Sequence, residues 1–239
     1  MQLDDITLYA LGDSVLVVQF SDSIGAVAHD AVMAFGRCLA DSPFVGMIEY
    51  VPAFTTVSIF YNPVVLSYED VQRQVMDRLL QLDDQATPPA RTVEIPVCYG
   101  GEFGPDLEFV AQYHGMSEED VIRIHSSPLY QVHMIGFAPG FPYLSGLSER
   151  IATPRLTTPR VRIPTGSVGI AGDQTGIYPI ETPGGWQLIG RSPVPLFQPS
   201  ACPPCLLRAG YSVRFMPITP AEYRELAQDK DVQLRGDTL

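Results

Sequence analysis

The sequence predicts an α+β protein, with a small α+β sandwich domain over residues 1–85 and a second, β-rich domain over residues 91–239. Three observations lead to this class. Strand-like and helix-like patterns alternate through the first 80 residues. A polar, proline-containing stretch without periodicity, residues 83–90, then forms a linker. Beyond it, residues 136–199 hold 10 Gly and 10 Pro in 64 positions, which excludes long helices and favours short strands joined by turns.

Apolar periodicity predicts each element of the first domain. Val15–Phe20 is a short apolar run typical of a buried strand. Residues 24–39 carry apolar side chains at i, i+4, i+7 and i+11, which predicts an amphipathic helix. Residues 46–51 and 55–61 are β-rich and predict a hairpin, and a second helix follows Ser67. This order favours helices on one face of an antiparallel sheet.

The second domain begins with a strand and two short helices. Residues 92–98 have the composition of a strand. The next segment predicts a helix with Asp106 as its N-cap and Gly115 as its stop, and another helix starts at Ser117 with acidic residues in its first turn. Near the C-terminus, the alternation in residues 206–215 predicts a further strand.

The charge balance excludes some functions and indicates another. Fifteen basic and 27 acidic side chains leave a net charge of −12, which argues against nucleic-acid binding. The only lysine is Lys230, so the chain has neither a phosphate-binding GxxxxGK[ST] loop nor a Schiff-base lysine at a core position. Residues 136–199 carry five Arg and three acids, a local charge of +2 against −14 for the rest, and this favours an anionic ligand there.

Other classes are excluded by hydropathy and by cysteine usage. No apolar run approaches the roughly 20 residues of a transmembrane helix. The segment MQLDDITLYALGD carries acid where a signal peptide carries base, so a cytoplasmic protein is expected. Four cysteines are too few for a disulfide framework and should be reduced thiols. Cys202 and Cys205 form a CxxC, but no further ligands complete a metal site, and the strand-like segment that follows does not suit a redox helix.

An aromatic segment rich in Gly and Pro, residues 136–146, is the first candidate for ligand binding. Its aromatic side chains alternate with turn residues, and such a loop offers rigid apolar surface together with exposed backbone N–H groups. A barrel corner filled by aromatic rings explains the pattern equally well. The candidate binding residues are Phe137, Pro139, Gly140, Phe141 and Tyr143.

A proline-punctuated segment, residues 153–167, is the second candidate. Prolines recur every five residues, which excludes a central strand and favours an extended surface segment. Arg155 and Arg160 each follow a proline, so a stiff backbone would hold the two guanidinium groups at an offset suited to a carboxylate or a phosphate. A solvent-exposed or intersubunit ion-paired face remains the alternative.

The third candidate combines residues 166–190, and Arg191 directly after them, with a histidine. The segment alternates small and β-branched residues without the strand–GxGxxG–helix order of a nucleotide site, so its glycines turn barrel corners or allow close approach. Gln174 and Thr175 could orient a ligand amide or a water molecule. His125 either acts as a general acid or base or stabilises a helix C-terminus as a cation. The candidate binding residues are Gly166, Ser167, Tyr178, Trp186 and Arg191.

Taken together, several motifs resemble one family, the B subunit of prokaryotic 5-oxoprolinase, also described as allophanate hydrolase subunit 1 or as a Kip-type histidine kinase inhibitor. They are LGDSVLVVQF (11–20), YGGEFGPDLEFVA (99–111), HSSPLYQVHMIGFAPGFPYLSGL (125–147), TPRLTTPRVRIPTGSVGIAGDQTGIYPIETPGGWQLIGRSPVPLF (153–197) and LLRAGYSVRF (206–215). Each motif alone would be weak, but their joint occurrence in one order is specific. The CPPC tetrad at 202–205 adds no role known in the family.

The resemblance implies an N-terminal α+β domain followed by a cyclophilin-like β-barrel. It also implies a non-autonomous subunit that works with a C subunit of homologous fold and with a larger A subunit. Together they use ATP to open 5-oxoproline to L-glutamate, because phosphorylation of a lactam oxygen creates the leaving group that the ring otherwise lacks. Under this hypothesis ATP binds at a shared site, with His125, Gln174 and Thr175 as catalytic candidates.

Two alternatives stay open at this stage. The chain could be a regulatory protein that inhibits a sensor histidine kinase, with the barrel as its docking surface. It could also be subunit 1 of an allophanate hydrolase. All three hypotheses predict the same fold, so the site has to separate them.

Overall fold

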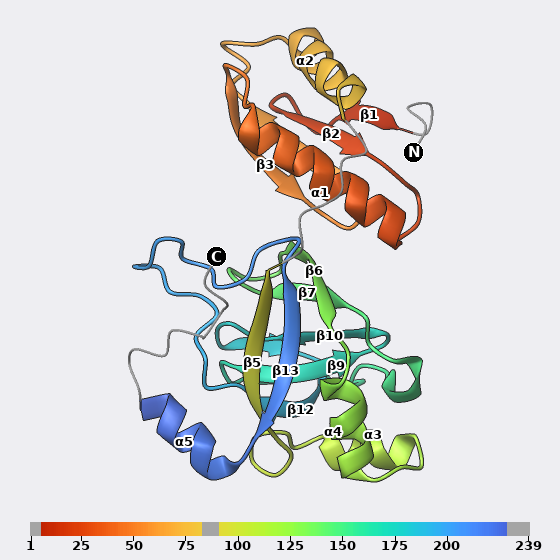
Figure 1. Cartoon of the computed structure of the whole chain (residues 1–239), viewed down its shortest axis with the longest axis vertical. Helices are drawn as coiled ribbons and strands as arrows, with labels where there is room; N and C mark the ends of the chain where they lie inside the picture. The colour runs from red at the N-terminus through yellow and green to blue at the C-terminus, as the bar shows by residue number, and fades with distance from the viewer. Residues whose placement is uncertain (1–5, 83–90, 229–239) are drawn as a thin grey trace. The chain divides into compact units, whose positions relative to one another are not determined.

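The computed structural model describes residues 6–82 and 91–228, and the chain divides into two compact units, residues 1–89 and 90–239. The mixed α/β architecture with a closed barrel confirms the predicted fold class (Figure 1). The predicted linker, residues 83–90, and Lys230 lie outside the described residues.

The first unit is a four-stranded antiparallel sheet packed against two helices. Its strands run in the order β1-β2-β4-β3, and both helices contact the sheet and each other. Val32, Phe35 and Leu39 of α1 are fully buried, as the helical periodicity requires. The elements are β1 (Thr7–Ala10), β2 (Val15–Gln19), α1 (Ala26–Asp41), β3 (Met47–Pro52), β4 (Thr56–Tyr61) and α2 (Tyr68–Leu80).

The sequence predicted every helix and strand of this unit except β1. The structure confirms the strand at 15–19, the hairpin of β3 and β4, and both helices. Ser67 caps α2, since its side chain accepts a hydrogen bond from the N–H of Asp70 and that carboxylate accepts one from the N–H of Ser67. β1 pairs with β2 across the turn after Ala10. Its four residues were too short a run to mark a strand.

The second unit is a closed seven-stranded barrel with the order β10-β7-β6-β13-β5-β12-β9 (Figure 1). β5 and β13 run parallel, and the other pairs are antiparallel. Apolar side chains fill the barrel, among them the fully buried Ile95, Ile170 and Phe215. The strands are β5 (Thr92–Tyr99), β6 (Tyr130–Ile135), β7 (Pro142–Ser145), β9 (Ser167–Ala171), β10 (Gln174–Ile177), β12 (Gln187–Arg191) and β13 (Ser212–Ile218).

Short elements surround this barrel. α3 contacts α4 and β12, α4 contacts β13, and α5 contacts β5. A separate two-stranded ribbon pairs β8 with β11, so part of the proline-punctuated segment, predicted to be extended and not a central strand, forms one strand of this ribbon. These elements are α3 (Leu107–Tyr113), α4 (Glu118–Ser126), the 3-10 turn η2 (Glu149–Ile151), β8 (Arg160–Ile163), β11 (Thr182–Gly184) and α5 (Pro220–Gln228).

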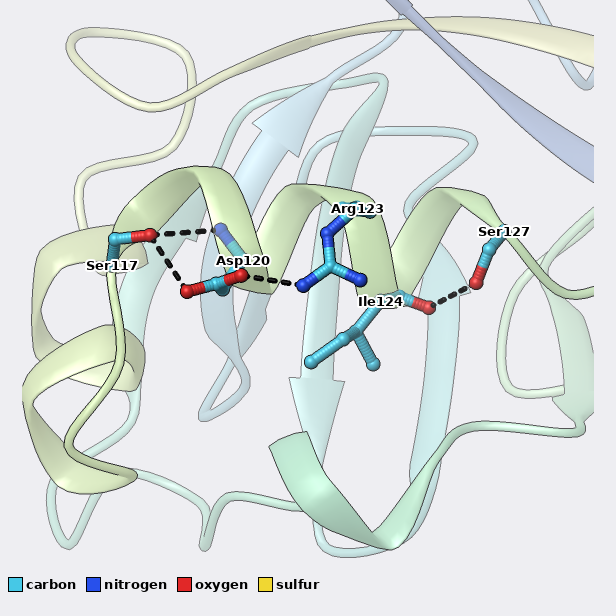
Figure 2. Close-up of polar contacts among 5 residues, drawn as sticks. All are labelled: Ser117, Asp120, Arg123, Ile124 and Ser127. Carbon is cyan, nitrogen blue, oxygen red and sulfur yellow. Dashed lines mark hydrogen bonds and ion pairs between the residues drawn. The ribbon is translucent and has the colours of Figure 1, made fainter.

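The ends of α4 follow from local chemistry (Figure 2). The Ser117 hydroxyl accepts a hydrogen bond from the N–H of Asp120 at 3.1 Å, and Arg123 pairs with the Asp120 carboxylate at 2.5 Å. These contacts lower the pKa of Asp120. At the other end, the Ser127 hydroxyl donates to the carbonyl of Ile124. An N-cap serine such as Ser117 stabilises a helix by about 1 kcal/mol.

The second unit departs from the sequence predictions in three details. Asp106 is the N-cap residue of α3, as predicted, but its side chain makes no capping hydrogen bond and bonds Arg160 and the N–H of Leu188 instead. The C-terminal strand spans 212–218, because residues 208–211 form a turn. Helix α5 was not predicted, although Thr219 and Glu222 form a reciprocal cap with a proline at the first helical position. The spacing of Thr219, Pro220 and Glu222 could have been recognised in the sequence as a helix start.

Candidate functional site

An aromatic cavity of about 160 Å³ lies in the barrel unit. Six of its lining residues are sequence-predicted binding residues from segments up to 49 positions apart, which the fold brings together. The lining consists of Phe137, Phe141, Tyr143, Arg155, Tyr178, Pro183, Gly184, Gly185 and Trp186. A volume below the usual 300–1,000 Å³ of drug-sized sites suits a small ring or a fragment of a larger ligand.

The wall of this cavity is a cluster of rings centred on Phe141. The Phe141 ring, 1% exposed, lies 5.3 Å from that of Phe137 and 5.3 Å from that of Tyr143, centroid to centroid. It lies 5.4 Å from Tyr178 and 5.6 Å from Trp186, in edge-to-face geometry. Such pairs each add about 0.5–1.5 kcal/mol beyond area burial. The wall is therefore rigid before any ligand arrives.

Phe137 is the strained and exposed member of the cluster. It has φ 65°, a left-handed conformation that costs a non-glycine residue about 1–3 kcal/mol. The loop closes on itself, since Gly136 N–H donates to the Phe141 carbonyl at 3.1 Å and Phe141 N–H donates to the Ala138 carbonyl at 3.0 Å. The ring remains 63% exposed. An exposed aromatic side chain held in a strained loop beside a cavity is a hallmark of a binding loop.

Glycine at position 184 is required by close packing in the cavity. A Cβ atom there would lie 2.6 Å from the Tyr178 hydroxyl and 2.7 Å from the Ile163 side chain. The absence of a side chain lets β11 approach the Tyr178 ring directly. Gly184, Gly185 and Pro183 were not predicted as lining residues, although the PGGW motif already marked a tight approach ahead of Trp186.

Arg155 provides the single charge among the lining residues. It is exposed and forms no ion pair with a carboxylate of the described residues. Beside it, burial raises the pKa of Tyr178 to about 12, although Arg155 and Arg160 act in the opposite direction. The Tyr178 phenol is therefore protonated at neutral pH. One cation and the Tyr178 hydroxyl thus lie among aromatic side chains, which suits a small anionic ligand.

Arg160 lies close by but is already engaged. Its guanidinium pairs with the Asp106 carboxylate at 2.6 Å and donates to the Trp186 carbonyl at 3.3 Å. The second oxygen of Asp106 accepts a hydrogen bond from the N–H of Leu188 at 2.6 Å. The expectation that Arg155 and Arg160 jointly offer their charges is therefore corrected. Arg160 therefore holds the Trp186 backbone through its hydrogen bond to the carbonyl. Asp106, predicted only as a helix cap, links Arg160 to the backbone N–H of Leu188.

Gly166, Ser167 and Arg191 lie outside the aromatic cavity. Arg191 and Ser167 are register partners across β12 and β9, and Cys98 of β5 is the next partner of Arg191. Burial raises the pKa of Tyr223 in α5, although the charge of Arg191 and its hydrogen bond to Tyr223 act in the opposite direction. Gly166 has φ +82°, and a Cβ there would clash with the Ser192 carbonyl oxygen. Arg191 is therefore not a lining residue of the cavity that Arg155 lines.

His125 and Thr175 form a closed hydrogen-bond chain inside the barrel. The Thr175 hydroxyl donates to the Gly169 carbonyl at 3.0 Å, so it accepts from His125 Nε2 at 2.9 Å. The other ring nitrogen, Nδ1, then accepts from the Tyr99 hydroxyl at 2.8 Å. Burial lowers the pKa of His125 from 6.5 to about 3, and the ring stacks on Phe215 at 4.6 Å.

This hydrogen-bond chain changes the expected role of His125. The ring is neutral and fully buried, so it does not act as a cation at the end of α4. Every hydrogen-bonding group of the ring already has a partner inside the barrel. Gln174 begins β10 at the hairpin with β9 and is not a lining residue of the cavity. The three catalytic candidates are thus not gathered at the aromatic cavity.

The remaining candidates support the cavity loop from behind. Gly140 has φ +83°, and a Cβ there would lie 3.0 Å from Phe197 Cβ, so the turn packs closely on the chain after β12. Pro139 precedes it in the same turn and does not line the cavity.

All four cysteines are free thiols. Within residues 6–82 and 91–228, no helix is long and apolar enough to span a membrane.

The family model of the carboxyltransferase domain, subdomain C and D, matches residues 6–207, so the chain belongs to the class of carboxyltransferase-domain proteins. The 5-oxoprolinase B subunit of Bacillus subtilis (strain 168) is 48% identical over 92% of this chain and 96% of its own length. That of Escherichia coli O157:H7 is 41% identical over 87% of this chain and 94% of its own. The chain belongs to the family of 5-oxoprolinase B subunits, which confirms the resemblance found in the sequence.

A solved structure shows the same architecture within a longer protein. TTHA0988 superposes with a TM-score of 0.76 at 38% identity, over 85% of this chain and 40% of that protein. The fold that carries the cavity therefore also occurs as one part of a larger chain.

Proposed function

We propose that the chain is the B subunit of an ATP-dependent 5-oxoprolinase that opens 5-oxoproline to L-glutamate together with its partners, the A and C subunits. The observation that carries this proposal is the 48% identity to the Bacillus subtilis B subunit over nearly the whole of both chains. The aromatic cavity supports it, because a five-membered lactam that bears one carboxylate matches a small aromatic site with one free cation.

In this proposal the cavity positions the substrate. The flat ring of 5-oxoproline packs against Phe141 and Trp186, and its carboxylate pairs with the Arg155 guanidinium. Tyr178, protonated because its pKa is about 12, donates a hydrogen bond to a substrate oxygen. Restriction of the substrate to one orientation lowers the entropic cost of the later reaction steps.

The same residues do not suit a triphosphate. The cavity offers one guanidinium and no carboxylate for a magnesium ion. Among the described residues, no group of three or more His, Cys, Asp and Glu is arranged to hold a metal ion. The sequence also lacks a GxxxxGK[ST] loop. We therefore assign ATP binding to a site shared with the partner subunits, with the lactam held by this chain.

Co-expression with candidate A and C subunits tests the proposal. The assembled complex should hydrolyse ATP in a 5-oxoproline-dependent manner, and omission of this chain should abolish that activity. Equal activity without this chain would refute the proposal. Inhibition of a sensor kinase, or hydrolysis of allophanate in place of 5-oxoproline, would then become the function to test.

A further inference from the structure

A second cavity, of about 420 Å³, lies in the barrel unit among residues that the proposed lactam site does not use. Its lining residues come from the loop between β12 and β13 and from Arg91, which directly precedes β5. Its lining includes Arg91, Arg208, Tyr211, Pro195, Pro203 and Pro204. The volume falls within the 300–1,000 Å³ that small-molecule sites usually occupy.

The charge of this cavity is positive, and within residues 6–82 and 91–228 it has no acidic partner. Arg91 and Arg208 line it, and no lining residue is acidic. Neither guanidinium forms an ion pair with a carboxylate of the described part of the chain. The Arg91 guanidinium lies 5.7 Å from the centroid of the Tyr211 ring, a cation–π contact that leaves its N–H groups available. Two available cations in one cavity contrast with a net charge of −12 for the whole chain.

The backbone holds both arginines in fixed positions. The N–H of Tyr211 donates to the Arg208 carbonyl at 3.1 Å, and the N–H of Ser212 donates to the Arg91 carbonyl at 2.9 Å. Consecutive residues at the start of β13 thus anchor the two arginines, although these lie far apart in the sequence. The backbone positions of both arginines are therefore set before a ligand binds.

The opposite wall is rigid as well. The N–H of Leu206 donates to the Leu196 carbonyl at 2.9 Å, and the N–H of Gln198 donates to the Pro204 carbonyl at 2.8 Å. These bonds close the loop into a hairpin-like turn. Its prolines have restricted backbone freedom, so the wall loses little entropy when it contacts a ligand.

We propose that this cavity binds a small ligand that carries two anionic groups, carboxylate or phosphate, which Arg91 and Arg208 hold. Guanidinium groups recognise both kinds of oxyanion through paired N–H donors. The less polar part of the ligand lies against Tyr211 and the prolines. This binding site is separate from the lactam site, and it requires neither a partner protein nor turnover.

Isothermal titration calorimetry of the full chain with two probes tests this proposal. Pyrophosphate represents a phosphate ligand, and succinate represents a dicarboxylate. At least one probe should bind saturably, and Arg91→Gln and Arg208→Gln should each weaken that binding about tenfold or more, since a charged hydrogen bond is lost. Arg150→Gln is the matched control, because Arg150 is an exposed arginine outside both cavities and should leave binding unchanged.

Three results would overturn the proposal. They are no saturable binding of either probe, unchanged affinity in both cavity variants, or an equal loss in Arg150→Gln, which would indicate general charge attraction. A probe-free melting curve for each variant ensures that folded proteins are compared. Binding of pyrophosphate alone assigns a phosphate ligand, and binding of succinate alone assigns a dicarboxylate. Since no 5-oxoproline is present, failure here is distinct from failure of the proposed activity.

Discussion

Two regions of the barrel unit each hold a pair of polar side chains that the sequence predicted as functional, and they differ in whether the hydrogen-bonding groups of those side chains already have partners. Inside the barrel, the donors and acceptors of His125 and Thr175 are satisfied by neighbouring residues. In the aromatic cavity, Arg155 and the Tyr178 hydroxyl have no such partner among the described residues. A polar group with its bonds satisfied stabilises a fold, whereas an unsatisfied group at a cavity can bind a ligand.

The largest expected effect concerns His125 in the hydrogen-bond chain inside the barrel and the pH dependence of the free energy of unfolding. The pKa of His125 is about 3 in the folded protein and 6.5 as the ordinary value, so the unfolded chain takes up a proton first as the pH falls. The contribution of His125 to stability is therefore full above pH 6.5 and decreases as the pH falls toward 3. The slope approaches about 1.4 kcal/mol per pH unit. Urea unfolding of the barrel unit, followed by the fluorescence of the single tryptophan, Trp186, measures it.

The variant His125→Leu is the reference for this measurement. At neutral pH it should be less stable than the wild type by about 3 kcal/mol, because Tyr99 and Thr175 lose their partner inside the barrel. Carboxylates and other histidines titrate in both proteins and cancel in the difference. That difference should shrink as the pH decreases below 6.5. A difference that stays constant with pH would show that His125 does not titrate as the structure implies.

The next effect concerns the unpaired cation of the cavity. In the assembled enzyme, Arg155→Gln should raise the KM for 5-oxoproline about tenfold or more, because the substrate carboxylate loses its charged partner. The stability of the protein should change by less than about 0.5 kcal/mol, since Arg155 is exposed and makes no ion pair with any residue that the structure describes. Steady-state kinetics and urea unfolding measure the two quantities separately.

Arg162→Gln is the control for Arg155→Gln. Arg162 lies in the same segment, is 77% exposed and pairs with Glu181 at 2.7 Å, outside the cavity. Its KM should equal that of the wild type. An equal rise of KM in both variants would mean that the local positive charge, and not a specific contact, attracts the substrate.

Whether a feature of the fold or of the candidate site could be predicted from the sequence depends on whether local spacing or a contact between distant residues determines it. Apolar spacing predicted α1 and α2, because periodicity in sequence reports directly on one buried face. The aromatic, arginine-bearing and PGGW segments were recognisable as candidates, since Gly and Pro restrict the backbone in known ways. That they meet in one cavity depends on barrel closure, which no local pattern encodes.

The partners of individual polar residues were not predictable. Asp106 precedes a helix and has the residue type of a cap, yet its carboxylate bonds Arg160 and Leu188 more than 50 positions later. Arg160 and Arg155 occupy equivalent places after a proline, yet only Arg160 has an acidic partner. His125 ends a helix as a cationic residue often does, but the barrel surrounds it completely. In each case a long-range contact decides the role.

A smaller effect would sharpen the contrast between the two arginines. Arg160→Gln should destabilise the protein by about 2 kcal/mol, because it leaves the Asp106 carboxylate, 13% exposed, without its cation. The KM for 5-oxoproline should rise less than in Arg155→Gln, since Arg160 contacts the Trp186 carbonyl and acts on the cavity only through that residue. In the double variant Asp106→Asn/Arg160→Gln, the loss of stability should be smaller than the sum of the two single losses. Additive losses would show that the pair is not coupled.

The smallest expected effect concerns the strained loop at the cavity. Phe137→Gly removes the cost of the left-handed backbone, φ 65°, but also the ring contacts with Phe141 and Tyr178, so the net change in stability should stay below about 1 kcal/mol. The KM for 5-oxoproline should nevertheless rise a few-fold, because an aromatic wall of the cavity is lost. Phe137→Tyr retains the ring and should restore the wild-type KM. A loss of several kcal/mol with an unchanged KM would instead make Phe137 a structural plug of the barrel corner.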